Sequence, residues 1–129
     1  MSHYSIMKIK LKNVNEELLI EAVKELAKEI NAQIVDQIHD YYGRVRTDFL
    51  IALKNSGFYR GVGIRINQET GEVELVGDFY GYRVHPKALE KLIAQYYTAA
   101  AVAYAARSLG MQVSGQKVED KIYMRCIEA

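Results

Sequence analysis

The sequence predicts an α+β fold, a two-layer sandwich in which two helices cover one face of a mainly antiparallel sheet. Several short segments alternate apolar and polar residues, a pattern typical of strands with one face on a core. Two longer segments have apolar residues at helical spacing. Between them lie consecutive strand patterns rather than the strand–helix–strand alternation of a parallel sheet. The expected order of elements is βαββββαββ.

Length and composition indicate a small globular protein. The chain has 129 residues, of which 50% are apolar and 26% charged, and residues 1–129 are expected to form a single α+β domain. The net charge of +1 gives no general attraction to nucleic acid or to an anionic membrane. Cys126 is the single cysteine, so no disulfide can form within the chain, which fits the cytoplasm.

The first elements follow from the pattern up to residue 30. A strand is predicted over Tyr4–Lys12, with alternate apolar residues facing the core and lysines facing outward. The pair Asn13 and Glu16 matches a capping box, which predicts that Asn13 caps a helix over roughly 15–30. The outward lysines are Lys8, Lys10 and Lys12.

A short strand over 33–37 and a three-stranded meander are predicted next. The meander strands cover 48–54, 61–66 and 72–76, joined by Asn55-Ser56-Gly57 and by a compact loop over 67–71. In the first strand, alternation predicts that Phe49, Ile51 and Leu53 share one face. The polar and aromatic segment at 39–44 is predicted to contain no element.

The C-terminal half reads as a long helix followed by a hairpin. Pro86 suits the first position of a helix and Gly110 suits its end, so the helix is expected over about 86–109. Its most apolar run, 92–106, is too short for a membrane span. Strand patterns at 111–117 and 121–127 predict a hairpin that turns at 118–120. No internal repeat is predicted.

The stretch GFYRGVGIR at 57–65 contains three glycines and two arginines. A phosphate-binding loop would lead into a helix, whereas this stretch continues as a strand pattern. We therefore predict a turn at 57–59 and a strand with Val62 and Ile64 on the core side. Gly61 and Gly63 then share a bare outer face with Arg65, which is expected to pair with Glu72 or Glu74 across the hairpin.

Catalytic and metal-binding patterns are weak. The three histidines, His3, His39 and His85, have no ligand spacing, so no metal and no cofactor are predicted. An enzyme or small-ligand site near His3 and His85, with Asp78 and Arg83, remains open as an alternative. Whether the protein is an enzyme stays uncertain at this point, with no catalytic residue assigned.

The leading prediction is a non-catalytic module that binds a protein partner or itself. Tyrosines in loops are typical of contact surfaces, because one ring offers both apolar area and a hydroxyl. An RNA- or DNA-binding module that uses Lys8, Lys10 and Lys12 with nearby aromatic residues is the alternative. The predicted ligand or partner surface comprises His3, Tyr41, Tyr42, Tyr59, Arg60, Gly61, Gly63, Arg83 and His85.

Several segments together resemble one uncharacterised family. Ser2-His3-Tyr4-Ser5, the strand at 60–65, the strand at 74–79 and the helix at 96–110 resemble, in the same order, the family that includes the conserved hypothetical chloroplast reading frame numbered thirty-five. Its members occur in cyanobacteria, plastids and other prokaryotes. The segments Tyr41–Arg46 and Phe79–Pro86 depart from the family's pattern. The resemblance implies a compact α+β domain, and it implies no reaction.

Overall fold

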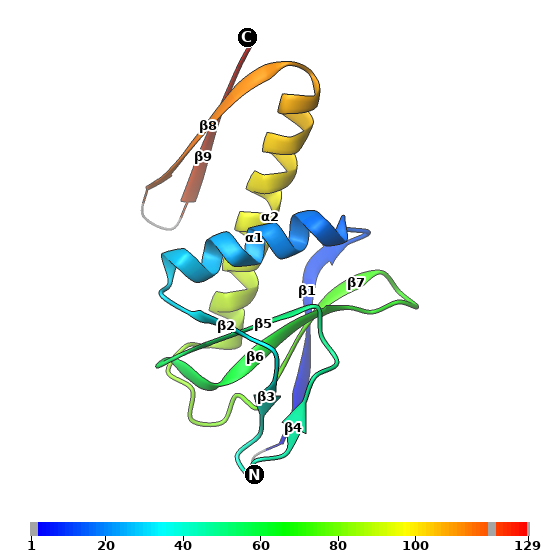
Figure 1. Ribbon diagram of the computed structural model, residues 1–129, viewed down its shortest axis with the longest axis vertical. Coiled ribbons are helices and arrows are strands. Elements are labelled where there is room, and N and C mark those ends of the chain that lie inside the picture. Colours follow the sequence, from blue (N-terminus) through cyan, green and yellow to red (C-terminus); the bar gives the residue numbers. More distant parts are fainter. Residues whose placement is uncertain (1–2, 119–120, 129) are drawn as a thin grey trace.

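A five-stranded antiparallel sheet forms the centre of the protein (Figure 1). The computed structural model describes residues 3–118 and 121–128. Every neighbouring pair of strands in this sheet is antiparallel, which confirms the predicted α+β class. In spatial order the strands are β1 (Ser5–Lys12), β7 (Glu72–Gly77), β6 (Phe58–Ile66), β5 (Ile51–Asn55) and β2 (Gln33–Val35).

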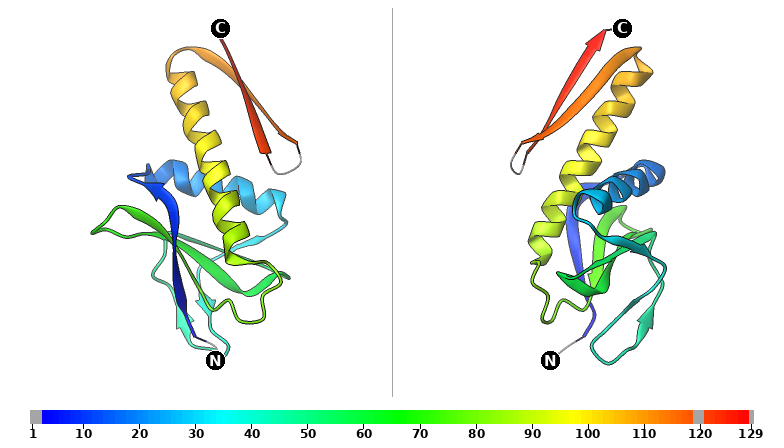
Figure 2. Two further views of the ribbon diagram at one scale, coloured as in Figure 1. Left: turned by 180° about the vertical axis from the view of Figure 1, so that it is seen from behind. Right: turned by 60° about the vertical axis from the view of Figure 1, so that its left-hand side comes forward.

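Two helices, α1 (Glu16–Glu29) and α2 (Pro86–Ser108), cover one face of this sheet, as predicted (Figures 1 and 2). Leu19, Val23 and Leu26 of α1 are fully buried, and they join Leu89 and Ile93 of α2 in the main core. The sheet contributes its inner apolar residues to the same cluster. Among the described residues, no helix is long and apolar enough to cross a membrane.

The opposite face of the sheet is covered by a small hairpin that the sequence did not predict. Its strands are β3 (Ile38–His39) and β4 (Val45–Arg46), paired in antiparallel register. Ile38 forms a second apolar cluster with Ala52 and Val76, and Phe49 packs against it. The prediction that Phe49 shares a face with Ile51 and Leu53 is therefore wrong, because β5 begins only at Ile51 and Phe49 lies across the sheet from their cluster.

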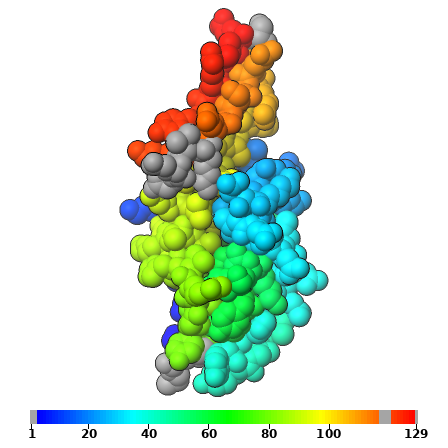
Figure 3. Space-filling view, turned by 90° about the vertical axis from the view of Figure 1, so that its left-hand side faces the viewer, coloured from blue at the N-terminus to red at the C-terminus, as the bar shows by residue number. Residues whose placement is uncertain are grey.

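A second hairpin, β8 (Met111–Val118) and β9 (Lys121–Glu128), confirms the C-terminal prediction. It forms a separate two-stranded sheet that folds back along α2, and both of its strands contact that helix (Figures 1 and 2). In the space-filling view the hairpin rises beyond the body formed by the central sheet and α1 (Figure 3). Glu119 and Asp120, assigned to the turn, lie outside the described residues.

Among the predicted helix ends discussed above, the N-terminal cap of α1 is the one that differs in the structure. Asn15, rather than Asn13, caps α1, and its Oδ1 accepts the amide hydrogen of Leu18 at 3.0 Å. Asn13 adopts a left-handed φ of 56° and donates its amide to the carbonyl of Gly71, so it belongs to the preceding turn. Pro86 occupies the first position of α2, and Gly110 follows the helix with a φ of 77°, both as predicted.

The hairpin of β5 and β6 confirms most of the interpretation of residues 57–65. Val62 and Ile64 are buried in the core, and Arg65 Nε donates to Glu74 Oε1 at 3.0 Å across the hairpin. Phe58, predicted in the turn, instead begins β6 and is fully buried. The turn is shorter than expected because Asn55 Oδ1 accepts the amide hydrogens of both Gly57 and Phe58.

Candidate functional site

The glycine face of β6 is covered by the chain itself. A Cβ added to Gly61 would lie 2.6 Å from Ile38 Cγ2, and one added to Gly63 would lie 2.9 Å from Phe49 Cδ2. The predicted close approach is therefore present, but the groups that approach belong to the β3–β4 hairpin and to the segment before β5. The expected bare outer face is absent at Gly61 and Gly63, since both glycines are buried.

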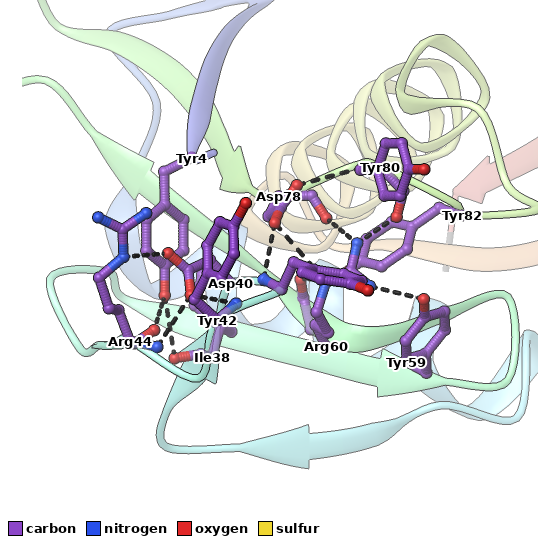
Figure 4. Close-up of polar contacts among 12 residues, drawn as sticks. Tyr4, Ile38, Asp40, Tyr42, Arg44, Tyr59, Arg60, Asp78, Tyr80 and Tyr82 are labelled. Carbon is purple, nitrogen blue, oxygen red and sulfur yellow. Dashed lines mark hydrogen bonds and ion pairs between the residues drawn. The ribbon is translucent and has the colours of Figure 1, made fainter. Parts of the chain in front are cut away.

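The turn of the β3–β4 hairpin is held by the carboxylate of Asp40, which is fully buried. Oδ1 accepts the amide hydrogens of Tyr42 and Arg44, each at 2.9 Å, and Oδ2 accepts Arg44 Nε at 2.5 Å (Figure 4). Burial alone would raise the pKa of Asp40, but the hydrogen bonds from Arg44 and Tyr42 and the charge of Arg44 outweigh it, and the pKa is lowered.

Arg60 points from β6 into a buried site between two tyrosine rings. Its guanidinium carbon lies 4.7 Å from the ring centre of Tyr59 and 4.9 Å from that of Tyr82. The guanidinium donates to the Tyr59 hydroxyl at 2.6 Å, to the carbonyl of Asp78 at 3.0 Å and to the carbonyl of Tyr80. Arg60 therefore fixes the first residues of the loop that follows β7.

Asp78 joins the two loops on this side of the sheet. Its Oδ2 accepts the amide hydrogen of Tyr41 at 2.8 Å, and its Oδ1 accepts that of Tyr80 at 3.3 Å (Figure 4). The carboxylate is buried and lies 3.8 Å from Arg60 Nε, so the positive guanidinium balances the negative carboxylate in the protein interior. One side chain thus holds both the β3–β4 turn and the loop at 79–85.

Tyr82 packs against Arg60 and completes the network. Its hydroxyl donates to the carbonyl of Gly61 at 2.8 Å, and its ring contacts those of Phe58, Tyr59 and Phe79. Burial raises the pKa of Tyr82 well above its ordinary value of 10.0, and the nearby charge of Arg60 offsets only part of that increase. The phenol is therefore a neutral structural group.

Four tyrosines project outward from this network, and we call them the tyrosine surface: Tyr41, Tyr42, Tyr59 and Tyr80. Their exposed fractions are 59%, 65%, 46% and 59% respectively. Tyr41 contacts Tyr42 and Tyr80 edge to face, with ring centres 5.4 Å and 6.0 Å apart. The surface combines two loops that are far apart in the sequence with the start of strand β6, which carries Tyr59.

The remaining predicted site residues lie elsewhere. His85 caps α2, where its Nδ1 accepts the amide hydrogen of Lys87 at 3.1 Å, and Arg83 donates to the carbonyl of Ser56 at 3.4 Å. His3 is exposed just before β1. Within residues 3–118 and 121–128, no group of three or more His, Cys, Asp or Glu side chains is arranged to hold a metal ion.

The three predicted lysines also take separate positions. Lys8 Nζ lies 3.5 Å from Glu72 Oε1 on the neighbouring strand β7, and Lys12 is paired with the same residue in strand register. Lys10 lines a groove between α2 and β9. The lysine strand and the tyrosine surface therefore do not form one continuous patch around the β3–β4 turn.

No protein-family model, curated protein or solved structure matches this chain. The geometry of the site is therefore the basis for any functional conclusion.

Sequence reasoning missed Asp40 and placed Asp78 with His3, Arg83 and His85 rather than with Asp40, although a signal was present. Asp40-Tyr41-Tyr42-Gly43 and Asp78-Phe79-Tyr80-Gly81 are two copies of one pattern, Asp-aromatic-Tyr-Gly. In both, the carboxylate accepts the amide hydrogen two residues on, and the glycine has a positive φ, 84° and 74°. The two turns pack against each other through Tyr41 and Tyr80.

Proposed function

We propose that this protein is a non-catalytic module that binds a protein partner through the tyrosine surface. The observation behind this proposal is that three exposed tyrosines, Tyr41, Tyr42 and Tyr80, stand on two turns whose backbone is fixed by the buried side chains of Asp40, Arg60 and Asp78. The fourth, Tyr59, lies on β6, and its hydroxyl accepts a hydrogen bond from the same Arg60. Exposed aromatic side chains have an energetic cost in water, and protein-contact surfaces are enriched in them.

Rigidity makes these tyrosines suited to binding. A tyrosine has few side-chain torsions, so it loses little conformational entropy on contact. The loops that present Tyr41 and Tyr80 are already ordered by hydrogen bonds to Asp78, and therefore less entropy is lost when a partner docks. Such pre-organised aromatic residues are the kind that provide most of the binding energy of an interface.

The buried polar groups support a structural role rather than a catalytic one. Asp40 and Asp78 accept backbone amide hydrogens, and Arg60 donates to backbone carbonyls. All three are at most 3% exposed, so a substrate has no direct access to them. Their hydrogen bonds hold loops in place, which is what a binding surface requires.

The position of the lysines favours a protein partner over a nucleic acid. The nucleic-acid alternative needs cations next to stacking surfaces. Lys8 is paired with Glu72, and Lys10 faces the groove beside α2, whereas the tyrosines lie around the β3–β4 turn at the other end of β1 (Figure 1). The patch that would join these lysines to the tyrosines is thereby divided. Arg44 is an exposed cation beside the tyrosines, and its guanidinium lies 5.7 Å from the ring centre of Tyr42 and is paired with the carboxylate of Asp40.

The family resemblance adds a further argument. It implies no reaction, and the segments in which this sequence departs from the family's pattern are Tyr41–Arg46 and Phe79–Pro86. These are the two segments that meet at the tyrosine surface. If the chain belongs to that family, the departure supports a partner that is particular to this chain.

The proposal is tested by site-specific photo-crosslinking in native lysate. A benzophenone amino acid replaces Tyr42, which is 65% exposed, and in a second protein it replaces Tyr104 on α2, which is 61% exposed. We expect a discrete crosslinked protein from position 42 only. Light scattering of the purified chain then shows whether the partner is a second copy.

A matched pair of variants provides the control. Tyr41→Ser with Tyr80→Ser removes the central ring contact, and Tyr104→Ser removes an equally exposed tyrosine elsewhere. The first should abolish the crosslink from position 42 and the second should preserve it. A crosslink pattern that is the same at both positions, or that survives loss of Tyr41 and Tyr80, would overturn the proposal. Retention of RNA in a low-salt filter assay, lost in Lys8, Lys10 and Lys12 variants, would support the alternative instead.

A further inference from the structure

We propose that the groove between α2 and β9 binds a single-chain anionic amphipath, in chemical terms an aliphatic carboxylate such as a fatty acid. The groove has a volume of about 700 Å³, which lies in the range of small-molecule sites. It is separate from the tyrosine surface, and the inference is independent of the function proposed above.

Aliphatic residues line the groove from both α2 and β9, together with the polar Gln95 and Thr98 of α2. Ala94, Ala99 and Val102 of α2 face Ile122 and Met124 of β9 across it. Ile122 and Met124 are only half-buried, although they point toward the helix from a two-stranded hairpin. A hairpin of two strands has little stability of its own, so apolar material that fills the gap between it and α2 would stabilise both.

The rim is cationic. Four lysines from three separate elements line the groove: Lys10 of β1, Lys87 and Lys91 of α2, and Lys121 of β9. Glu90 is the acidic residue among its lining side chains in the described part of the chain, and its Oε2 lies 3.5 Å from Lys87 Nζ. Among the described lining residues, four lysines stand against one glutamate, so positive charge is in excess there, in a chain whose overall net charge is only +1.

The cationic residues and the aliphatic residues that α2 contributes to the groove occupy successive parts of the helix. Lys87 and Lys91 lie in the first two turns of α2, whereas Ala99 and Val102 lie about 12–22 Å further along, at about 1.5 Å per residue. The hairpin runs back along α2, so that Lys121 begins β9 near its turn, before Met124 (Figures 1 and 2). A head group at the lysine end and an alkyl chain toward Val102 would match this order.

The charged residues that line a neighbouring hollow differ in sign from those that line the groove. A second hollow, between α1, α2 and the hairpin, shares Ala99, Ile122 and Met124 with the first but is lined by glutamates. These are Glu21, Glu25 and Glu29, and the lysine among its lining residues in the described part of the chain, Lys28, is paired with Glu25 at 3.1 Å. An anionic head group is therefore attracted to the β1 side and repelled from the α1 side. A cationic amphipath would show the opposite preference.

Titration of the full chain with dodecanoate tests the inference. A dansylated undecanoate reports binding, since the chain has no tryptophan, and dodecanoate is added below the concentration at which it aggregates. We expect saturable binding of one molecule per chain that strengthens up to about fourfold per methylene from octanoate to dodecanoate. Amide hydrogen exchange of β9 should slow on binding. Dodecyltrimethylammonium, with the same tail and a positive head, should not compete.

Two pairs of variants separate the groove from general attraction. Lys87→Gln with Lys91→Gln should weaken binding at least tenfold, whereas Lys24→Gln with Lys28→Gln on α1 should leave it unchanged. Val102→Glu, at a position already 40% exposed, should also weaken binding without unfolding the protein. Absence of saturable binding, equal competition by the cationic amphipath, or equal loss in both lysine pairs would overturn the inference.

Discussion

Gly61 of β6 lies directly against the side chain of Ile38 on β3. A Cβ at position 61 would come within 2.6 Å of Ile38 Cγ2, and Gly61 also has a φ of 93°. The close approach seats the β3–β4 hairpin on the sheet, and through Asp40 it sets the position of Tyr41 and Tyr42. Gly61 is thus required both for the packing of the β3–β4 hairpin and for the position of two residues of the tyrosine surface.

Gly61→Ala is expected to destabilise the protein by about 3 kcal/mol. The left-handed backbone costs a non-glycine residue about 1–2 kcal/mol, and the overlap with Ile38 adds about 1–3 kcal/mol. Urea unfolding at pH 7 measures the loss. Partner crosslinking from position 42 should fall as well, since the hairpin must shift to admit the new methyl group.

Gly43→Ala provides the matched control for this substitution. Gly43 has a similar φ of 84°, but a Cβ there would have nothing within 4 Å. Gly43→Ala should therefore lower the free energy of unfolding only by the cost of the left-handed backbone, about 1–2 kcal/mol. Equal losses for the two variants would contradict the close contact between Gly61 and Ile38.

Arg60→Met should cost about 3–5 kcal/mol, because it leaves the Asp78 carboxylate buried without its partner charge. Arg60→Lys keeps the charge but loses the planar group that lies between Tyr59 and Tyr82, so we expect an intermediate loss. Chemical denaturation of both variants measures these values.

The double variant Arg60→Met with Asp78→Asn checks the assignment. If the two side chains form one unit, the double variant should lose less stability than the sum of the single variants. Amide exchange should also accelerate at Tyr41 and Tyr80, whose amides bind Asp78. Strict additivity, with no change at these two amides, would contradict the described network.

The main sheet and both helices could be predicted because their signals are periodic. Alternation at β1 and β6 and helical spacing in α1 were sufficient to place Ile9, Val62 and Leu26 in the core. A core that lies on one face of a strand leaves a regular trace in the sequence. The C-terminal hairpin was predicted for the same reason.

The candidate site was harder to predict because it depends on irregular structure. β3 and β4 have two residues each, too few for alternation to be visible. Whether Gly61 faced solvent or another segment depended on Ile38, which is 23 residues away in sequence. The repeated Asp-aromatic-Tyr-Gly pattern was visible, but its meaning required knowing that both turns lie on the same side of the sheet.

Acid should weaken the β3–β4 turn through Asp40. Its pKa in the folded protein is below the ordinary value of 3.8, so its contribution to the free energy of unfolding is complete above that value and is lost as pH falls below it. Asp40→Asn should be less stable than wild type at pH 7, and the difference should shrink toward pH 3. Unfolding in urea at several pH values measures this.

Asp48→Asn is the comparison for the acid experiment. Hydrogen bonding from Arg46 lowers the pKa of Asp48 too, but the Asp48 side chain is 52% exposed, so solvent screens its interactions. We expect a smaller loss at pH 7 than for Asp40→Asn. A larger loss for Asp48→Asn would show that the buried turn is not the acid-sensitive element.

Alkali should act through Tyr82. Because burial raises its pKa above 10.0 in the folded protein, the unfolded state releases this proton first, and stability is lost as pH rises above about 10. Tyr82→Phe removes the hydrogen bond to the Gly61 carbonyl and should cost about 1 kcal/mol at pH 8. Between pH 10 and 11 the variant should then lose less stability than wild type, so that the two unfolding free energies approach each other. Tyr104→Phe, on the exposed side of α2, should follow the wild-type profile. Parallel profiles for wild type and Tyr82→Phe would contradict the half-buried, neutral phenol next to Arg60.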